Sequence, residues 1–392
     1  MLSTQEKMEN KKVRIAVAMS GGVDSSVAAS LLVTQGYEVV GLTMQLYDHG
    51  VKTAQSKSCC AGTDIYDAKR VADHLGIVHY VLNYEKTFER DVIQPFVNAY
   101  MNGETPIPCV LCNQTVKFRD LIDAAKSIGA TALATGHYIR SVQTEFGSEL
   151  YRAVDRKRDQ SYFLFATTSE QLSFLKFPLG SLKKSETRQI ADEIGLSIAD
   201  KADSQDICFV PDGHYTDVIG KLDTEGLKRQ GKGRLIHVDG YDIGEHKGID
   251  HYTVGQRRGL NIGGEPAPLY VLSIHPDTNI IIVGPRECLA KSSIIIRDVN
   301  WISSAGEIPI DNINVNIRIH SAHEAVSGTI RRGTEKDGAI VTFDEPLYGL
   351  SPGQACVLYD GDQMLGGGWI VKDKNHNIIP HNKRHETSVV LG

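Results

Sequence analysis

A glycine-rich stretch near the N-terminus, Ser20-Gly-Gly-Val-Asp-Ser-Ser26, constrains the fold of this chain more than any other feature. It lies between a short apolar, β-branched run over residues 13–19 and a run over residues 27–35 whose apolar side chains recur at helical spacing. This pattern predicts a buried strand, a tight turn and a helix. Glycines let a ligand approach the backbone, and serines add hydroxyl donors beside the unsatisfied amides of a helix N-terminus. The stretch is therefore interpreted as a phosphate-binding loop.

The loop differs from the two most common nucleotide-binding turns. A Walker-type loop carries a lysine after its last glycine, and a dinucleotide fold requires Gly-x-Gly-x-x-Gly, and this stretch has neither. An ordinary Gly-Ser turn is the plainer alternative. Ser-Gly-Gly-x-Asp-Ser instead resembles the pyrophosphate loop of the ATP-pyrophosphatase superfamily. That resemblance implies an enzyme that cleaves ATP between its α- and β-phosphates and attaches AMP to an oxygen of its substrate.

Strand-like and helix-like runs alternate after the loop. Strands are expected over residues 39–44, 77–82 and 130–134, and helices over residues 64–75 and 121–128. This alternation predicts an α/β fold with a doubly wound parallel sheet, which binds ligands at the carboxyl ends of its strands. The loop, Met44, Gly136 and His137 all fall at such ends. We therefore expect a single nucleotide pocket with these candidate ATP-binding residues: Ala18, Met19, Ser20, Gly21, Gly22, Val23, Asp24, Ser25, Met44 and Gly136.

The length of the chain, 392 residues, predicts more than one domain. We expect an ATP-binding catalytic domain over residues 1–213, which includes a long functional loop over about 196–213. A small, glycine-rich central domain is expected over residues 214–284. Short β-type runs separated by turn signals then predict a C-terminal antiparallel β-barrel over residues 285–392.

Composition places the chain among soluble globular proteins, with 41% hydrophobic and 23% charged residues. No apolar run approaches a membrane span, and the polar N-terminus lacks a signal-peptide core, so we expect a cytoplasmic protein. The net charge of −6 argues against a globally basic nucleic-acid coat. A single local basic cluster is typical of a solvated surface, but the chain has several, and their number favours an RNA-binding face. They include Arg156 to Arg158, Lys183-Lys184, and Lys228, Arg229, Lys232 and Arg234.

The seven cysteines do not suggest a disulfide framework, because their number is odd and no secretion signal precedes them. Cys109-Val-Leu-Cys112 forms a C-x-x-C, for which three interpretations compete. A zinc site would need a second pair or a histidine at metal spacing. A thioredoxin-like dithiol is disfavoured because the pair follows what reads as a loop, Thr105 to Pro108. A nucleophilic Cys112 near the N-terminus of a helix over residues 115–122 is the third, and an inert buried thiol is the alternative for any single cysteine.

Seven motifs are spread along the chain. They are the loop Ser20–Ser26, Thr105-Pro-Ile-Pro108 with Leu111-Cys-Asn113, Lys117-Phe118, Ala134-Thr-Gly-His-Tyr138, Asp159 to Leu164, Asp203-Ser204 with Ile207-Cys-Phe209, and Gly255-Gln-Arg-Arg-Gly-Leu260. Together they resemble the bacterial tRNA-specific 2-thiouridylase family, and the resemblance covers nearly the whole chain from residue 13. Only the first motif is shared with the wider superfamily.

The resemblance implies ATP-dependent 2-thiolation of the wobble uridine of tRNA, with the C2 oxygen adenylated first. It implies that Cys208 carries sulfur as a persulfide, that Cys112 is the partner thiol, and that a transient Cys112–Cys208 disulfide results. Mg²⁺ would accompany ATP, with Asp24 a candidate ligand. A sulfur-relay protein and a reductant are the implied partners, no membrane is involved, and a monomer is expected. The implied tRNA contacts are His137, Arg158, Asp159, Gln160, Arg318 and Gln354.

One position departs from the family pattern. Many members have an aspartate where this chain has Cys109, and a thiol cannot replace a carboxylate in acid–base chemistry at neutral pH. Two other functions stay open at this point. One is a different adenylating enzyme of the superfamily with a small acceptor, and the other is a non-catalytic RNA-binding sulfur carrier.

Overall fold

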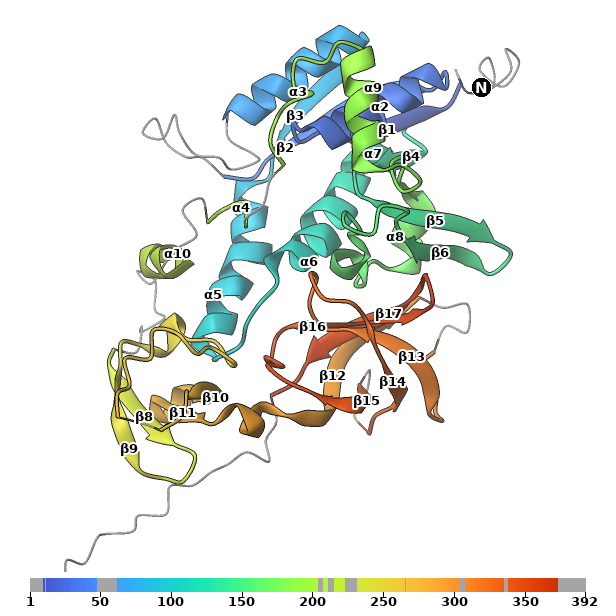
Figure 1. Ribbon diagram of the computed structural model, residues 1–392. Coiled ribbons are helices and arrows are strands. Elements are labelled where there is room, and N and C mark those ends of the chain that lie inside the picture. The colour runs from blue at the N-terminus through green and yellow to red at the C-terminus, as the bar shows by residue number, and fades with distance from the viewer. Residues whose placement is uncertain are drawn as a thin grey trace, which may run out of the picture.

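The computed structural model describes residues 10, 12–47, 62–203, 207–210, 215–222, 231–264, 266–302, 307–334 and 338–372. Figure 1 shows a parallel sheet with its helices at the top, a small sheet at the lower left and a barrel at the lower right. Ser204, Lys228 and Arg229 lie outside the described ranges, as do two of the seven cysteines, Cys59 and Cys60.

The N-terminal part forms a five-stranded parallel sheet. Its strands are β1 (Arg14–Ala18), β2 (Glu38–Gln45), β3 (Val78–Asn83), β4 (Ala132–Ala134) and β7 (Leu175–Lys176), in the order β3-β2-β1-β4-β7. Every neighbouring pair is parallel. The doubly wound sheet predicted from the alternating runs is therefore confirmed.

Helices cover both faces of this sheet because its central strand is apolar on both sides. On β1, Ile15 and Val17 belong to one buried cluster and Ala16 to another. The first cluster includes residues of α2 (Val23–Thr34), α3 (Gly62–Leu75) and α9 (Lys184–Glu193). The second includes residues of α7 (Leu121–Ser127) and of the helical segments that precede it.

The connection from β3 to β4 is a series of short helical segments. These are α4 (Glu85–Phe88), the π-helical η2 (Glu89–Ile93), α5 (Gln94–Met101), α6 (Pro108–Cys112), the π-helical η3 (Asn113–Asp120) and α7. From Pro108 to Ser127 the chain is continuously helical. The expected start of this helix near Thr115 is wrong, because Pro108 begins it at a position where a missing amide hydrogen costs nothing.

A hairpin after β4 was not expected from the sequence. Its strands, β5 (Ile139–Thr144) and β6 (Gly147–Arg152), pair with each other, and β6 also pairs with β17 of the barrel. Three short elements follow, η4 (Ser161–Leu164), α8 (Ser169–Phe174) and β7. The hairpin thus joins the sheet of the last domain although it lies between two strands of the first.

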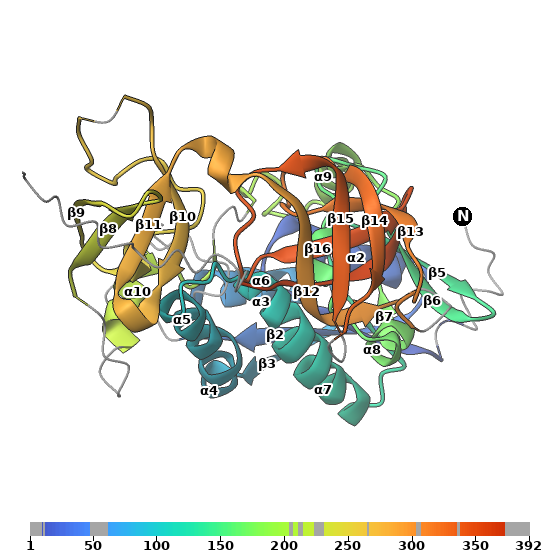
Figure 2. The ribbon, with the colours of Figure 1, turned by 90° about the horizontal axis from the view of Figure 1, so that it is seen from below.

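A four-stranded sheet occupies the middle of the chain. It contains β8 (Gly233–His237), β9 (Asp242–His246), β10 (Tyr270–His275) and β11 (Ile280–Gly284), in the order β10-β11-β8-β9. Figures 1 and 2 both show it side by side with the barrel. The helical segments around it are α10 (Tyr215–Leu222), η6 (Ile249–His251), η7 (Pro276–Thr278) and η8 (Arg286–Leu289).

The last domain is a closed antiparallel barrel, as predicted. Its strands are β12 (Lys291–Trp301), β13 (Ile313–Arg318), β14 (Val326–Arg332), β15 (Ala339–Leu347), β16 (Ala355–Asp360) and β17 (Gln363–Ile370). The order is β12-β15-β14-β13-β16-β17, and pairing of β12 with β17 closes the barrel. Within the described ranges no helix combines the length and apolarity of a membrane span.

Candidate functional site

The predicted phosphate-binding loop joins β1 to α2 and is packed closely against α3 at Gly21. Gly21 adopts φ +71°, and a Cβ there would lie 2.1 Å from the carbonyl oxygen of Asp64. Gly22 precedes α2, and no side chain caps that helix. The Ser26 hydroxyl donates to the Gly22 carbonyl oxygen (2.8 Å) and so turns away from the first amides. An anion can therefore bind the amides at this helix N-terminus.

The predicted nucleotide residues gather at one edge of the parallel sheet. Ala18 ends β1, and Met44 is the last residue but one of the neighbouring strand β2. The Met19 amide donates to the Leu42 carbonyl oxygen (2.8 Å). Gly136 follows β4, the other neighbour of β1. A Cβ on Gly136 would lie 2.7 Å from the amide nitrogen of Ser25, so this glycine is in close contact with the start of α2.

Lys184 contacts the loop, although in the sequence it belongs only to a pair of lysines that is typical of a solvated surface. Its side chain is 9% exposed, whereas its neighbour Lys183 is exposed. The Lys184 Nζ lies 2.7 and 2.9 Å from the two carboxylate oxygens of Asp24. The Tyr138 hydroxyl also donates to Asp24 (2.8 Å). Asp24 therefore has both oxygens engaged.

The Asp203 carboxylate forms ion pairs with three side chains beside the loop. It lies 2.8 Å from Lys184 Nζ, 2.9 Å from Arg158 Nη1 and 3.3 Å from Arg188 Nη2. Burial alone would raise the pKa of Asp203, but the hydrogen bond and charge of Lys184, with the two arginines, hold that pKa below its ordinary value. Asp203 thus links the loop, through Lys184, to the turn that carries Arg158.

Lys201 holds the other side of the loop. Its Nζ donates to the Gly21 carbonyl oxygen (3.0 Å) and to carboxylates of α3, Asp64 (2.7 Å) and Asp67 (2.6 Å). Burial raises the pKa of Asp64 although Lys201 opposes the shift. The loop is therefore fixed to α3 by a lysine from the segment that leads toward Cys208.

The two cysteines implied in sulfur transfer belong to one apolar cluster. Cys112, at the end of α6, is buried, and the partly buried Cys208 packs against the same cluster. Next to Cys208, Phe209 makes edge-on ring contacts with Phe88 and Phe96, at centroid distances of 5.7 and 5.1 Å. The Tyr47 hydroxyl donates to the Cys208 carbonyl oxygen (2.7 Å). These contacts hold Cys208 beside α4 and α5, the helices that precede α6 in the chain.

Cys109 differs from Cys112 in its surroundings. It is exposed and is the second residue of α6. The C-x-x-C follows a loop over residues 104–107, as expected, but contrary to expectation it also opens a helix. Cys109 rather than Cys112 lies in the first turn, where a helix N-terminus stabilises a thiolate.

The predicted tRNA-contact residues fall into two groups. Arg158 is exposed and Gln160 is half-buried, with its side chain accepting from the Tyr138 amide (2.9 Å). Asp159 and Arg318 are buried and form an ion pair of 2.8 Å between the turn and β13. In this conformation the charges of Asp159 and Arg318 neutralise each other, and their ion pair links the barrel to the turn.

His137 contacts η3, which follows α6, through the ring of Phe118, and Gln354 contacts the segment that precedes α6. The His137 Nδ1 is 2.9 Å from the Thr135 hydroxyl, and burial, with the nearby Lys117, lowers the pKa of His137 to about 3. At neutral pH its imidazole is uncharged. The Gln354 amide donates to the Thr105 carbonyl oxygen (2.9 Å), three residues before α6. Gln354 thus joins the barrel to the segment that leads into the cysteine pair.

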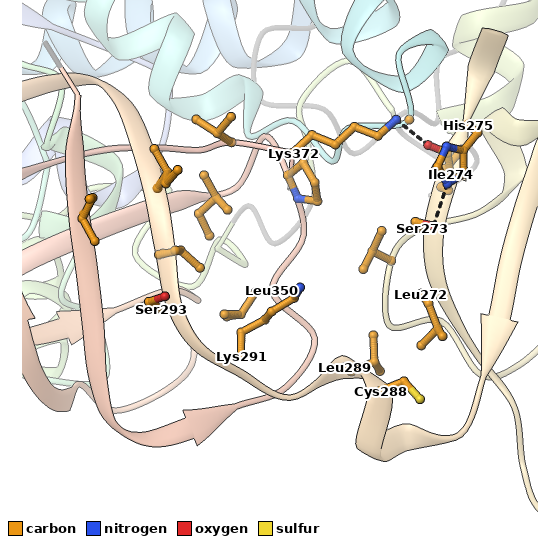
Figure 3. Close-up of a pocket in the computed structure, with 18 residues that line it drawn as sticks. Leu272, Ser273, Ile274, His275, Cys288, Leu289, Lys291, Ser293, Leu350 and Lys372 are labelled. Atoms are coloured by element: carbon orange, nitrogen blue, oxygen red, sulfur yellow. Dashed lines mark hydrogen bonds between the residues drawn. The ribbon is translucent and has the colours of Figure 1, made fainter. Parts of the chain in front are cut away.

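A cavity of about 480 Å³ lies between β10 and the barrel, apart from the predicted site (Figure 3). Lys372 crosses it and donates to the Ile274 carbonyl oxygen (2.6 Å). Burial lowers the pKa of Lys372, and burial with Lys372 lowers that of His275. None of the predicted site residues lines this cavity. Among the described residues, no group of three or more His, Cys, Asp or Glu side chains could hold a metal ion.

Three protein families match successive parts of the chain. Residues 13–212 match a family described as the tRNA methyl transferase HUP domain. Residues 224–285 match the tRNA methyl transferase PRC-barrel domain, and residues 291–370 the aminomethyltransferase beta-barrel domain. These ranges follow the parallel sheet, the small sheet and the barrel.

Curated relatives match over nearly their whole length. A tRNA-specific 2-thiouridylase of Rhodospirillum centenum is 52% identical over 366 residues, which cover 92% of each chain. Proteins of the same name from Rickettsia bellii (51%; 93% of this chain, 98% of the relative) and Parvibaculum lavamentivorans (52%; 94% and 93%) are similarly close. A solved 4-thiouridine synthetase–RNA complex with bound ATP aligns with a TM-score of only 0.33 and 17% identity over 51% of this chain and 46% of its own.

Proposed function

The chain belongs to the family of tRNA-specific 2-thiouridylases, which are tRNA-uridine 2-sulfurtransferases, and on this premise we propose that it thiolates tRNA at C2 of the wobble uridine with the use of ATP. The observation that carries the proposal is the pairing of an uncapped phosphate-binding loop with two cysteines of one cluster. The loop would bind the ATP that activates the uridine, and the two cysteines would transfer the sulfur atom. An enzyme that adenylates a small acceptor does not require the two cysteines.

ATP would bind at the edge of the parallel sheet, with its phosphates on the loop. The first amides of α2, which no side chain caps, support this assignment. Adenylation of the uracil C2 oxygen releases pyrophosphate and turns a poor leaving group into AMP. The residues proposed to hold ATP are Ala18, Met19, Ser20 to Ser25, Met44 and Gly136.

The described residues do not form a ready magnesium site. Asp24, the proposed ligand, has both oxygens hydrogen-bonded to Lys184, and Tyr138 donates to one of them. In this conformation a cation at Asp24 would have to share the carboxylate with the Lys184 ammonium group. No step is therefore assigned to Mg²⁺ on the protein.

Sulfur would reach the uridine from a persulfide on Cys208. The thiolate of Cys112 attacks the Cys208 sulfur atom, a Cys112–Cys208 disulfide forms, and hydrosulfide leaves. Hydrosulfide then attacks C2, and AMP departs with the former C2 oxygen. A sulfur-relay protein must renew the persulfide, and a dithiol reductant must return two electrons to the disulfide. Direct attack by the persulfide on C2, assisted by Cys112, gives the same products.

Arg158, Gln160, His137 and Gln354 are proposed to contact tRNA around this site. The exposed Arg158 is suited to a phosphate. Asp159 and Arg318 are proposed to hold the contact surface in place, since their charges pair with each other. With tRNA as the substrate, we propose a cytoplasmic enzyme.

Cysteine substitutions test the sulfur-transfer roles. We expect Cys112→Ser and Cys208→Ser each to abolish 2-thiouridine formation, because each removes one of the two sulfur atoms that the exchange requires. Cys109→Ser should keep most activity and serves as the matched control. The readout is mass spectrometry of nucleosides from tRNA treated with purified variants, the sulfur donor and ATP. An inactive Cys109→Ser beside an active Cys112→Ser would contradict the assignment.

A further inference from the structure

Lys184 brings a positive charge to a phosphate loop that lacks its own lysine. It is the first residue of α9, and only 7% of its surface is exposed. Its Nζ lies 2.7 Å from Asp24, the second residue of α2. The ammonium group is therefore next to the helix N-terminus where phosphates are expected.

Asp203 shares the ammonium with Asp24. The Asp203 carboxylate is 2.8 Å from Lys184 Nζ and is itself held by Arg158 and Arg188. An ammonium buried this far is costly without a carboxylate partner. Asp203 can supply that partner when Asp24 does not, so Lys184 has a second anchor that keeps it at the loop.

Lys201 does not have the same freedom. Its Nζ already donates to the Gly21 carbonyl oxygen and to two carboxylates of α3, so these hydrogen bonds fix the loop to α3. A triphosphate on the loop would bring several negative charges close to Asp24 and would repel that carboxylate. The ammonium of Lys184 is the group placed to relieve this repulsion.

We propose that Lys184 is a phosphate-binding residue. When ATP binds, its ammonium group exchanges Asp24 for oxygens of the β- and γ-phosphates, and Asp203 retains it throughout. The proposal rests on the proposed use of ATP. In this proposal Asp203, which had no role in the proposed function, positions Lys184.

Binding of ATP and of AMP separates this role from a structural one. Full-length protein is titrated with each nucleotide by calorimetry, without tRNA or sulfur donor. We expect Lys184→Gln to weaken ATP binding by roughly tenfold or more and to leave AMP binding within about twofold, because AMP lacks the β- and γ-phosphates. Lys183→Gln, at the adjacent exposed position, should match the wild type with both nucleotides, and Lys184→Arg should restore part of the preference for ATP.

A second variant keeps the test decisive if Lys184→Gln fails to fold. Asp24→Asn removes the carboxylate that competes with phosphate for the ammonium. In EDTA the ratio of ATP affinity to AMP affinity should rise severalfold. The proposal is overturned if Lys184→Gln binds ATP like the wild type, if it loses both nucleotides equally, or if Asp24→Asn lowers the ratio. A wild-type protein that binds no ATP would overturn the proposed function as well, whereas failed thiolation with intact ATP binding would leave Lys184 in its role.

Discussion

At the scale of single residues, the site depends on close contacts that only small or charged side chains can make. Gly136 is packed against the start of α2, and Lys184 and Lys201 hold the loop by hydrogen bonds of 2.7 to 3.0 Å. The loop itself was predicted from Ser20–Ser26. The lysines were not, because they are distant in sequence and lack a motif, so only folding brings them to Asp24 and Gly21.

Gly136→Ala should abolish ATP binding and lower the stability of the protein. The added methyl group would lie 2.7 Å from the Ser25 nitrogen and 3.1 Å from the Asp24 Cβ, so the start of α2 must move. Gly263→Ala is a matched control, because nothing lies within 4 Å of a Cβ at that exposed position. ATP titration and thermal unfolding measure both effects. Tight ATP binding by Gly136→Ala would show that Gly136 is not part of the pocket.

At the scale of elements, short helical segments position the cysteines through polar contacts between them. Asp91 of η2 pairs with Arg90 and, across to η3, with Arg119 (2.5 Å). The helix over 108–127 was predicted only from Thr115, because Pro-Cys-Val-Leu-Cys contains few residues that signal a helix. The β5–β6 hairpin was missed because its strands are mostly polar and are not fully buried, so they lack a clear apolar pattern.

The Asp91 pairs predict a specific dependence of stability on pH. The hydrogen bond from Arg90, with help from Arg119, outweighs burial and lowers the pKa of Asp91 from 3.8 to about 2. A carboxyl whose pKa is lower in the folded state stabilises that state above its unfolded pKa, and the contribution disappears as pH falls through the folded pKa. Asp91→Asn should therefore lower the unfolding midpoint in urea at pH 7. The difference from wild type should shrink between pH 4 and pH 2.

Asp73→Asn, on α3, controls for a general loss of negative charge. An Asp91→Asn effect that stays constant down to pH 2 would contradict the assigned pairing.

At the scale of the whole molecule, the barrel is attached to the parallel-sheet domain by buried hydrogen bonds. The Tyr162 hydroxyl lies 2.9 Å from the Ile319 carbonyl oxygen and 3.0 Å from that of Ala355, and Tyr162 is 1% exposed. The barrel was predicted from the spacing of its strands, and the parallel sheet from its alternating runs. Their attachment was not predictable, because it uses a β6–β17 pairing and side chains that follow no periodic pattern.

Tyr162→Phe should destabilise this attachment by about 1 to 3 kcal/mol, because two buried carbonyl groups lose a donor without a change in packing. Chemical unfolding followed by tryptophan fluorescence reports it, since both tryptophans, Trp301 and Trp369, lie in the barrel. Tyr66→Phe, at an exposed position of α3, should have no effect. Equal unfolding curves for Tyr162→Phe and wild type would show that the hydroxyl does not contribute to the attachment.

In the proposed reaction, the C2 oxygen of the uridine becomes a leaving group at the ATP-binding loop, and sulfur from Cys208 replaces it. The most direct test uses tRNA labelled with ¹⁸O at that oxygen, with ATP and the sulfur donor. Mass spectrometry should find one labelled oxygen in the phosphate of AMP for each 2-thiouridine formed, and none in pyrophosphate. Formation of 2-thiouridine with unlabelled AMP, or with the label in water, would contradict the account.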